Sequence, residues 1–247
     1  MDYFQKIIYD IEVLSPEGIK ECFENGVDPN GTFRDKPLIN ELITGYLRSE
    51  RFKECIRVFT EYGLDFNDQL LLAVLTDDAS SLEEILTRNP SDIHRKYSFN
   101  CAFTPLHEAS LLHICAEYNH LSCAKVLIAH GFDVNTKAGI DENGFGGHTA
   151  IFHTVNQNSG DFLEFTKHLI SESSDLTYTV KGLIWGENYE WETFIPSVNP
   201  MSYAMMGLLP QFQRTERQIY DTVSVLLKGA YGIDYIPVNV PNTYLGK

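Results

Sequence analysis

The chain has 247 residues, of which 43% are hydrophobic, and its formal net charge is −15. This length allows one large domain, two small domains or a repeat array, and the apolar content is sufficient for a continuous core. The acidity argues against binding to nucleic acids or to anionic membrane surfaces, because both repel a negative field. It favours a basic protein partner, or it serves solubility alone.

No segment of the sequence is typical of secretion or of membrane spanning. The amino terminus has an acid at position 2 and no basic segment followed by a long apolar stretch, so we expect no secretory signal. The longest plainly apolar run covers residues 70–75, which is too short to cross a bilayer. Cysteine is sparse and odd in number, which indicates free thiols in a reducing cytoplasm. The five cysteines are Cys22, Cys55, Cys101, Cys115 and Cys123.

A five-residue ending of the form Gly-x-Asp-x-Asn occurs three times, each time after an amphipathic helical pattern. The copies are Gly26–Asn30, Gly63–Asn67 and Gly131–Asn135, with weaker copies at Asn89–His94 and Ser173–Thr177. Glycine at this point suits the left-handed backbone that ends many helices, and we expect Asn89 to adopt the same conformation. The recurrence predicts an array of helical repeats.

The stretch from Ser110 to Asn135 resembles one ankyrin repeat almost position by position. Leu112-His113 matches the Leu-His of the family's opening motif, Cys115-Ala116 matches its paired small residues, and Gly131–Asn135 matches its ending. The resemblance implies paired helices that approach closely over the small residues, and a His113 side chain that hydrogen-bonds backbone at the turn. It also implies a surface of first helices and hairpin fingers that binds another protein.

The spacing within two repeats departs from the family pattern. Thr104–His107 also matches the opening Thr-Pro-Leu-His, and its Pro105 stands 26 positions before Gly131. Pro37 likewise stands 26 positions before Gly63, whereas about twenty residues separate these two points in the family's repeat. We therefore expect both repeats to carry an extended first helix.

These observations predict an all-α fold, an ankyrin-type helical solenoid with hairpin fingers and one inserted β-hairpin. Because a repeat cannot bury its apolar face alone, we expect a single array over residues 1–247 rather than separate globular domains. The expected units are an amino-terminal cap at 1–35, repeats at 36–68, 69–95, 96–138 and 139–178, a hairpin insert at 179–199, a last repeat at 199–230 and a carboxyl-terminal tail at 231–247.

A cluster of histidines and cysteines in the central repeat suggests a metal site, but packing is the better interpretation. Zinc sites usually present short Cys-x-x-Cys or His-x-x-x-His pairs, and no pair here has that spacing. We therefore expect no metal ligand in this set. Its members are His107, His113, Cys115, His120 and Cys123.

Catalytic interpretations are weaker still. The stretch Gly139–Gly147 lacks the Lys-Ser/Thr pair of a phosphate-binding loop, its acids disfavour phosphate, and its glycine comes too early for a calcium loop. No Gly-x-Ser-x-Gly nucleophile motif occurs, and His148 and His153 have no evident nucleophile beside them. We expect no catalytic residue and no cofactor, and we interpret residues 139–147 as a long finger.

The segment 179–199 is the clearest addition to the repeats. Val180–Trp185 and Glu190–Ile195 are rich in aromatic and β-branched residues, which predicts a β-hairpin. Strand alternation would place Glu190 and Glu192 on one face, toward solvent or a basic partner, and Trp191 on the inner face. The alternative is a lid with a structural role only. The expected partner-binding residues, on this hairpin and on the finger, are Asp141, Glu142, Phe145, Trp185, Glu187, Tyr189, Glu190 and Glu192.

The expected function is non-catalytic binding of another protein, and the negative charge favours a basic partner. One concrete form is an inhibitor that neutralises a basic enzyme, such as an immunity protein against a nuclease-type toxin. Alternatives are an intracellular adaptor or the regulatory subunit of an enzyme, in which acidity serves solubility, and an unrecognised hydrolase within residues 136–230. We expect no nucleic-acid or membrane partner, and a monomer when the partner is absent.

Overall fold

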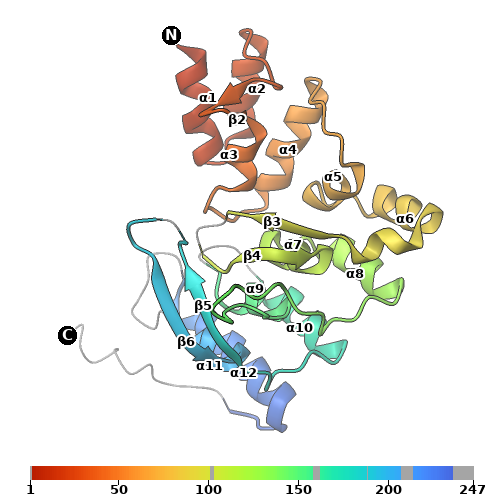
Figure 1. Cartoon of the computed structure of the whole chain (residues 1–247), viewed down its shortest axis with the longest axis vertical. Helices are drawn as coiled ribbons and strands as arrows, with labels where there is room; N and C mark the ends of the chain where they lie inside the picture. Colours follow the sequence, from red (N-terminus) through yellow and green to blue (C-terminus); the bar gives the residue numbers. More distant parts are fainter. Residues whose placement is uncertain (1, 101–102, 158–161, 188, 207–213, 236–247) are drawn as a thin grey trace.

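The computed structural model of the chain describes residues 2–100, 103–157, 162–187, 189–206 and 214–235. Helix pairs follow one another along the described chain, and β-hairpins project from their connections (Figure 1). The helices are α1 (Tyr3–Glu12), α2 (Pro16–Glu24), α3 (Ile39–Ile43), α4 (Arg51–Glu61), α5 (Gln69–Leu75), α6 (Ala79–Arg88), α7 (Leu111–Tyr118), α8 (Leu121–Ala129), α9 (Ile151–Val155), α10 (Leu163–Ser171), α11 (Pro200–Met205), α12 (Glu216–Tyr231) and the 3₁₀ helix η1 (Pro90–His94).

Stacking of neighbouring helices builds the core. The α1–α2 pair contacts α3 and α4, α5 and α6 contact α7 and α8, and α7 is followed in the stack by α9 and then α11. The outer helices α10 and α12 also contact each other. One continuous cluster of buried apolar side chains runs through these elements from Ile7 to Leu226. The molecule is therefore a helical repeat array in which each pair covers the apolar face of its neighbour.

Three of the repeat endings have the backbone that the sequence predicts. Gly26, Gly63 and Gly131 have φ angles of 91°, 90° and 86°, in the left-handed region that an L side chain avoids. The prediction for Asn89 is wrong, because its φ is −132°. Pro90 follows it and starts η1 directly, and a residue before proline is restricted to extended backbone.

The asparagine that closes the repeat ending has a separate role. The Asn30 side chain donates to the Gly63 carbonyl at 2.9 Å and accepts from the Asp65 amide at 2.7 Å. The Asn135 side chain makes the same pair of bonds with Ser173 O at 3.1 Å and Asp175 N at 2.7 Å. Each asparagine thus joins its own repeat ending to the corresponding ending further along the array.

The expected extension of two first helices is wrong. In the central repeat the additional residues form the strand β4 (Leu106–Ser110), which pairs antiparallel with β3 (Lys96–Phe99), and α7 begins only at Leu111. In the earlier repeat α3 ends at Ile43, and residues 44–50 form a non-helical connection to α4. Ser110 caps α7 through its contact with the His113 ring, which fixes the start of that helix after the strand.

Helices are accompanied by three two-stranded antiparallel sheets within the described residues, so the fold is helix-rich but not built of helices alone. Beside β3–β4 these are β1 (Thr32–Phe33) with β2 (Lys36–Pro37), and β5 (Val180–Trp185) with β6 (Thr193–Val198). The expected carboxyl-terminal tail lies mostly outside the described residues, which end at 235, and Cys101 also lies outside them. Among the helices described, none combines the length and the apolar character that a membrane crossing requires.

Candidate partner-binding site

The β5–β6 hairpin carries its aromatic residues at the turn rather than on the strands. Because β6 begins at Thr193, Glu190 and Trp191 lie in the turn, where strand alternation does not apply. The prediction that Trp191 packs inward is therefore wrong, and its side chain is 44% exposed. Gly186 has a φ of 60°, and a Cβ built there would lie 2.4 Å from the Trp191 ring, so the indole lies directly over the turn backbone.

Trp185, in contrast, anchors the hairpin to the helices. Its Nε1 donates to the Tyr203 hydroxyl at 2.6 Å, and that hydroxyl lies 2.7 Å from Thr104 Oγ1. Tyr203 is completely buried on α11, and burial raises the pKa of its phenol. Phe103 contacts the Trp185 ring edge-on and also contacts the Trp191 ring, with centroid separations of 6.1 and 5.6 Å. Trp185 is thus a positioning residue for the turn.

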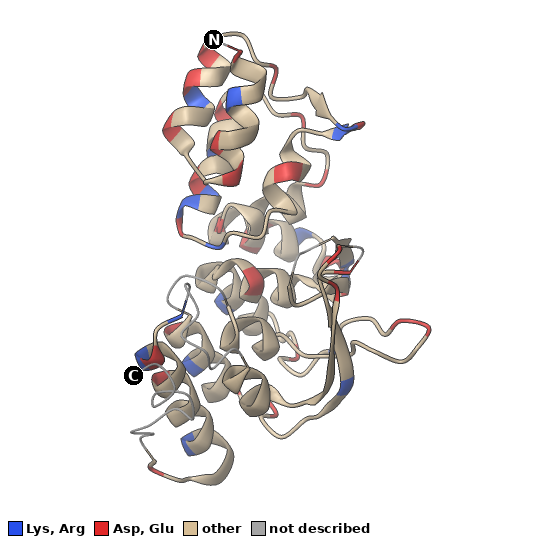
Figure 2. Ribbon diagram, turned by 90° about the vertical axis from the view of Figure 1, so that its left-hand side faces the viewer, with Lys and Arg blue, Asp and Glu red and all other residues tan. Residues whose placement is uncertain are grey.

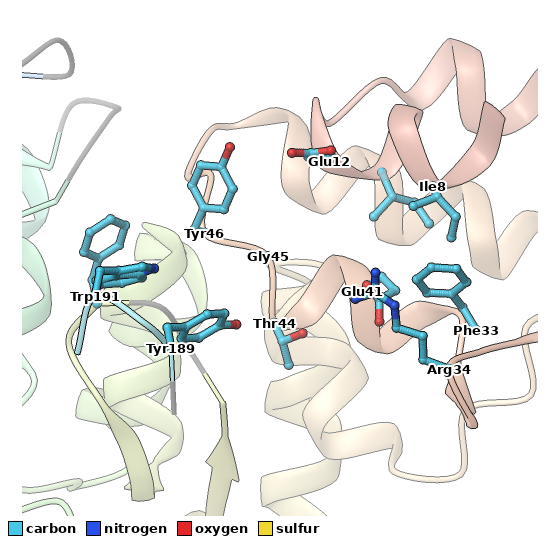
Figure 3. A pocket seen from close by; sticks show the side chains of 12 residues that line it. Ile8, Glu12, Phe33, Arg34, Glu41, Thr44, Gly45, Tyr46, Tyr189 and Trp191 are labelled. Carbon is cyan, nitrogen blue, oxygen red and sulfur yellow. The ribbon is translucent and has the colours of Figure 1, made fainter. Parts of the chain in front are cut away.

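The turn faces the amino-terminal helices across a groove of about 550 Å³. Figure 3 shows Tyr46, Tyr189 and Trp191 at one end of it and Phe33, Arg34 and Glu41 at the other. Residues of the amino-terminal segment 8–46 and of the hairpin turn thus line one groove, although they are far apart in sequence. The lining residues are Ile8, Ile11, Glu12, Phe33, Arg34, Glu41, Thr44, Gly45, Tyr46, Phe103, Tyr189 and Trp191.

The charged residues that line the groove are two glutamates, Glu12 and Glu41, and one arginine, Arg34. Neither Glu12 nor Glu41 has an ion pair with any residue in the described part of the chain. The Arg34 guanidinium lies over the Phe33 ring, 4.8 Å from its centroid. Asp and Glu positions recur along the amino-terminal helices, with a few Lys and Arg positions among them (Figure 2).

The finger at residues 139–147 lies against the hairpin and not in the groove. The Phe145 ring contacts the Phe194 ring with centroids 4.7 Å apart, and the Lys181 ammonium donates to the Asn143 carbonyl at 2.6 Å. Asp141 accepts from the Asn143 and Phe145 amides and so shapes the finger tip, where Glu142 is exposed.

The expected site residues therefore do not form one site, and Glu142 stands apart at the finger tip. Tyr189 lines the groove, and Trp185 stands behind it. A separate cavity of about 100 Å³ beside the finger is lined in part by Asp141, Phe145 and Glu187. Glu190 and Glu192 are exposed at the hairpin turn, as expected.

Sequence reasoning missed the part of the groove supplied by the amino-terminal residues 8–46. Glu12, Phe33, Glu41 and Tyr46 were not among the expected site residues. The signal that Tyr46 carries in the sequence is a large aromatic ring in the connection between two helices. Its side chain is 47% exposed.

Buried polar groups behind the site form a network that links three repeats. Arg48 pairs with Glu117 at 2.7 Å, and the other carboxylate oxygen of Glu117 lies 2.6 Å from His153 Nδ1 and accepts from Gln157 at 2.8 Å. Burial alone would raise the pKa of Glu117, but the Arg48 charge and the His153 contact outweigh it and hold that pKa below its ordinary value. Glu117 and Arg48 come from α7 and from the connection before α4, so the network joins the amino-terminal helices to the central repeat.

The buried histidines of this region make hydrogen bonds that support the fold. His113 Nε2 bonds to the His148 carbonyl at 3.0 Å and Nδ1 lies 2.7 Å from Ser110 Oγ, which confirms the turn contact that the resemblance implies. Burial, with repulsion from His153, lowers the pKa of His113 to about 3, and burial also lowers that of His148. Within the described ranges, no group of three or more His, Cys, Asp and Glu side chains is arranged to hold a metal ion.

Comparison with known families finds a match to the central repeat. A family model for the ankyrin repeat matches residues 103–138, which cover β4, α7, α8 and the ending that follows them. The match includes Phe103 from the groove, while the other lining residues lie outside it. A comparison with curated proteins finds no match.

Proposed function

We propose that the chain, which contains an ankyrin repeat at residues 103–138, is a non-catalytic module whose groove and adjoining hairpin turn bind a protein partner. Ankyrin repeats generally mediate protein–protein interaction. The observation that carries the proposal is the groove itself, because three large aromatic rings are held at its surface with 42–47% of their area exposed. Exposed aromatic clusters of this kind are enriched at the energetic centres of protein interfaces.

The chemistry of the surface favours a basic partner. Glu187, Glu190 and Glu192 are exposed on or beside the hairpin turn, and the whole chain has a net charge of −15. A negative surface accelerates the approach of a positive partner and raises specificity more than it raises affinity. Inhibition of a basic enzyme, as by an immunity protein, is one form that this function takes in our proposal.

The setting that we propose is a reducing cytoplasm, with one continuous array acting as a monomer until it meets its partner. Support comes from the four described cysteines, all buried and all free. Burial raises the pKa of the thiols of Cys22 and Cys55 to about 11 and about 12, which keeps them protonated and unreactive.

Affinity capture tests the proposed function. The immobilised chain is exposed to lysate of the source organism, and the bound proteins are identified and their affinities measured at low and at physiological ionic strength. We expect a basic partner whose affinity falls as salt rises and falls again with the double variant Glu190→Lys, Glu192→Lys.

A matched control is the pair Glu54→Lys, Glu61→Lys on α4, which makes the same charge change at exposed positions outside the groove. Equal loss of binding in both pairs would indicate a general charge effect and would contradict the assigned surface. The melting temperatures of both double variants should stay close to that of the wild type, since all four glutamates are exposed.

A further inference from the structure

The aromatic end of the groove is held in place before any ligand arrives. The Tyr189 and Trp191 rings stack with their planes 21° apart, and the Phe103 ring also contacts the indole. Gly186 leaves the space that the indole occupies, so a side chain there would displace it. Rings that are fixed in this way lose little conformational entropy when a ligand binds on them.

A ligand in this groove must match both apolar side chains and carboxylates. Ile8, Ile11 and the rings are apolar, whereas Glu12 and Glu41 present carboxylates with no ion pair in the described part of the chain. A purely apolar ligand would cover these carboxylates without compensating their charge, which is costly. An acidic ligand would add repulsion to that cost.

An arginine side chain meets both requirements. Its methylene stem packs on aliphatic walls, while its planar guanidinium stacks on aromatic faces and pairs with carboxylates. The chain already gives an example at the far end of the groove, where the Arg34 guanidinium lies over Phe33 beside Glu41 (Figure 3). The opposite end, formed by Tyr46, Tyr189 and Trp191 near Glu12, has no such cation from the described residues.

We propose that this groove binds an extended segment of the partner protein and receives one of its arginine side chains between Tyr46, Tyr189, Trp191 and Glu12. The proposal deepens the proposed function by naming the chemistry of the partner, and it rests on that function. In this arrangement the guanidinium lies against the Tyr46 and Tyr189 rings, and Trp191 supports Tyr189 by stacking on it. Glu12 neutralises the charge of the guanidinium, and the remaining length of the groove accommodates backbone on either side.

The test uses a fluorescent heptapeptide with three arginines separated by glycines, and the same peptide with citrulline in place of arginine. Citrulline keeps the shape of the side chain and removes its charge. We expect the arginine peptide to bind at least about tenfold more tightly than the citrulline peptide, as one desolvated cation–π contact combined with one ion pair allows. Trp191→Ala and Glu12→Gln should each weaken arginine-peptide binding by about tenfold.

Matched controls are Tyr235→Ala and Glu61→Gln, an exposed ring and an exposed carboxylate that do not line the groove. These variants should bind the arginine peptide like the wild type. Equal affinity for the two peptides, no binding of either, or an unchanged affinity in both groove variants would overturn the proposal.

The outcome is separable from that of the proposed function. If the arginine peptide fails while a captured partner is still lost in the Glu190→Lys, Glu192→Lys variant, the chain binds its partner by another chemistry and only the arginine site is wrong. If the peptide binds with the expected dependence on Trp191 and Glu12 while capture finds no partner, the arginine site stands and the proposed function is wrong.

Discussion

The central repeat around α7 and the groove beside the β5–β6 turn differ in how far their side chains are exposed to solvent. All eight residues of α7 are buried, including Glu117, whereas Tyr46, Tyr189 and Trp191 keep nearly half of their side-chain area in solvent. The repeat is recognisable in sequence because burial restricts what each position tolerates. The groove has no comparable signature, because its walls come from distant segments and its exposed positions are less restricted. Changes in the repeat should therefore affect stability, and changes in the groove should affect binding.

The largest expected effect is on the buried ion pair. Glu117→Gln removes the carboxylate charge that pairs with the buried Arg48 guanidinium, and we expect the free energy of unfolding to fall by about 3–5 kcal/mol. Urea denaturation measures this change. Glu84→Gln removes the carboxylate of an exposed pair with Arg88 and should cost less than about 1 kcal/mol. Equal effects of the two variants would abolish the contrast between the buried repeat and the surface.

The second largest expected effect is a loss of folding stability at acid pH. His113 and His120 have pKa values lowered to about 3 and about 4 in the folded chain, against an ordinary value of about 6.5 when unfolded. The unfolded chain therefore binds more protons as the pH falls below about 6.5, and stability should decline by at most about 1.4 kcal/mol per pH unit for each such histidine. Protonation of Glu117 at lower pH acts in the same direction, since its folded pKa is also lowered.

Urea midpoints between pH 7 and pH 4 measure this decline. His113→Gln should reduce its slope, because one of the titrating groups is then absent. A stability that stays constant over this range would contradict the burial of neutral histidines.

A smaller effect separates the two candidate starts of the central repeat. His113→Ala removes three buried hydrogen bonds and leaves the His148 carbonyl without that donor, which should cost about 1–3 kcal/mol. His107→Ala should change little, since His107 is exposed on β4. Thermal denaturation of both variants compares them, and the reverse order would contradict the assigned start of the repeat.

The smallest expected stability change lies in the groove. Gly186→Ala places a side chain at a φ of 60° and against the Trp191 ring, which should cost about 1 kcal/mol and displace the indole. The fractional loss of the arginine-peptide binding free energy should exceed the fractional loss of the free energy of unfolding. Lys181→Ala on the neighbouring strand is a control for damage to the hairpin, and unaltered arginine-peptide binding in Gly186→Ala would show that the indole position is unimportant.

What could be predicted from the sequence follows the same division. The glycine endings and the β5–β6 hairpin were foreseeable because local backbone preference and strand propensity decide them. The strand β4 was not, since Thr104–His107 matches a motif that normally opens a helix, and only its pairing with β3 makes it a strand. Nor could the groove be foreseen, because nothing local indicates that Glu12 and Trp191 line the same groove.

The paired bonds of Asn30 and Asn135 have a consequence for how such a chain can change over evolutionary time. Each asparagine fixes the separation of two repeat endings, while the residues between those endings differ in number and conformation. The connection at 44–50 and the finger at 139–147 both lie between such fixed points. Insertions there are tolerated because the endings stay in step, so new recognition loops can be acquired without rebuilding the stack.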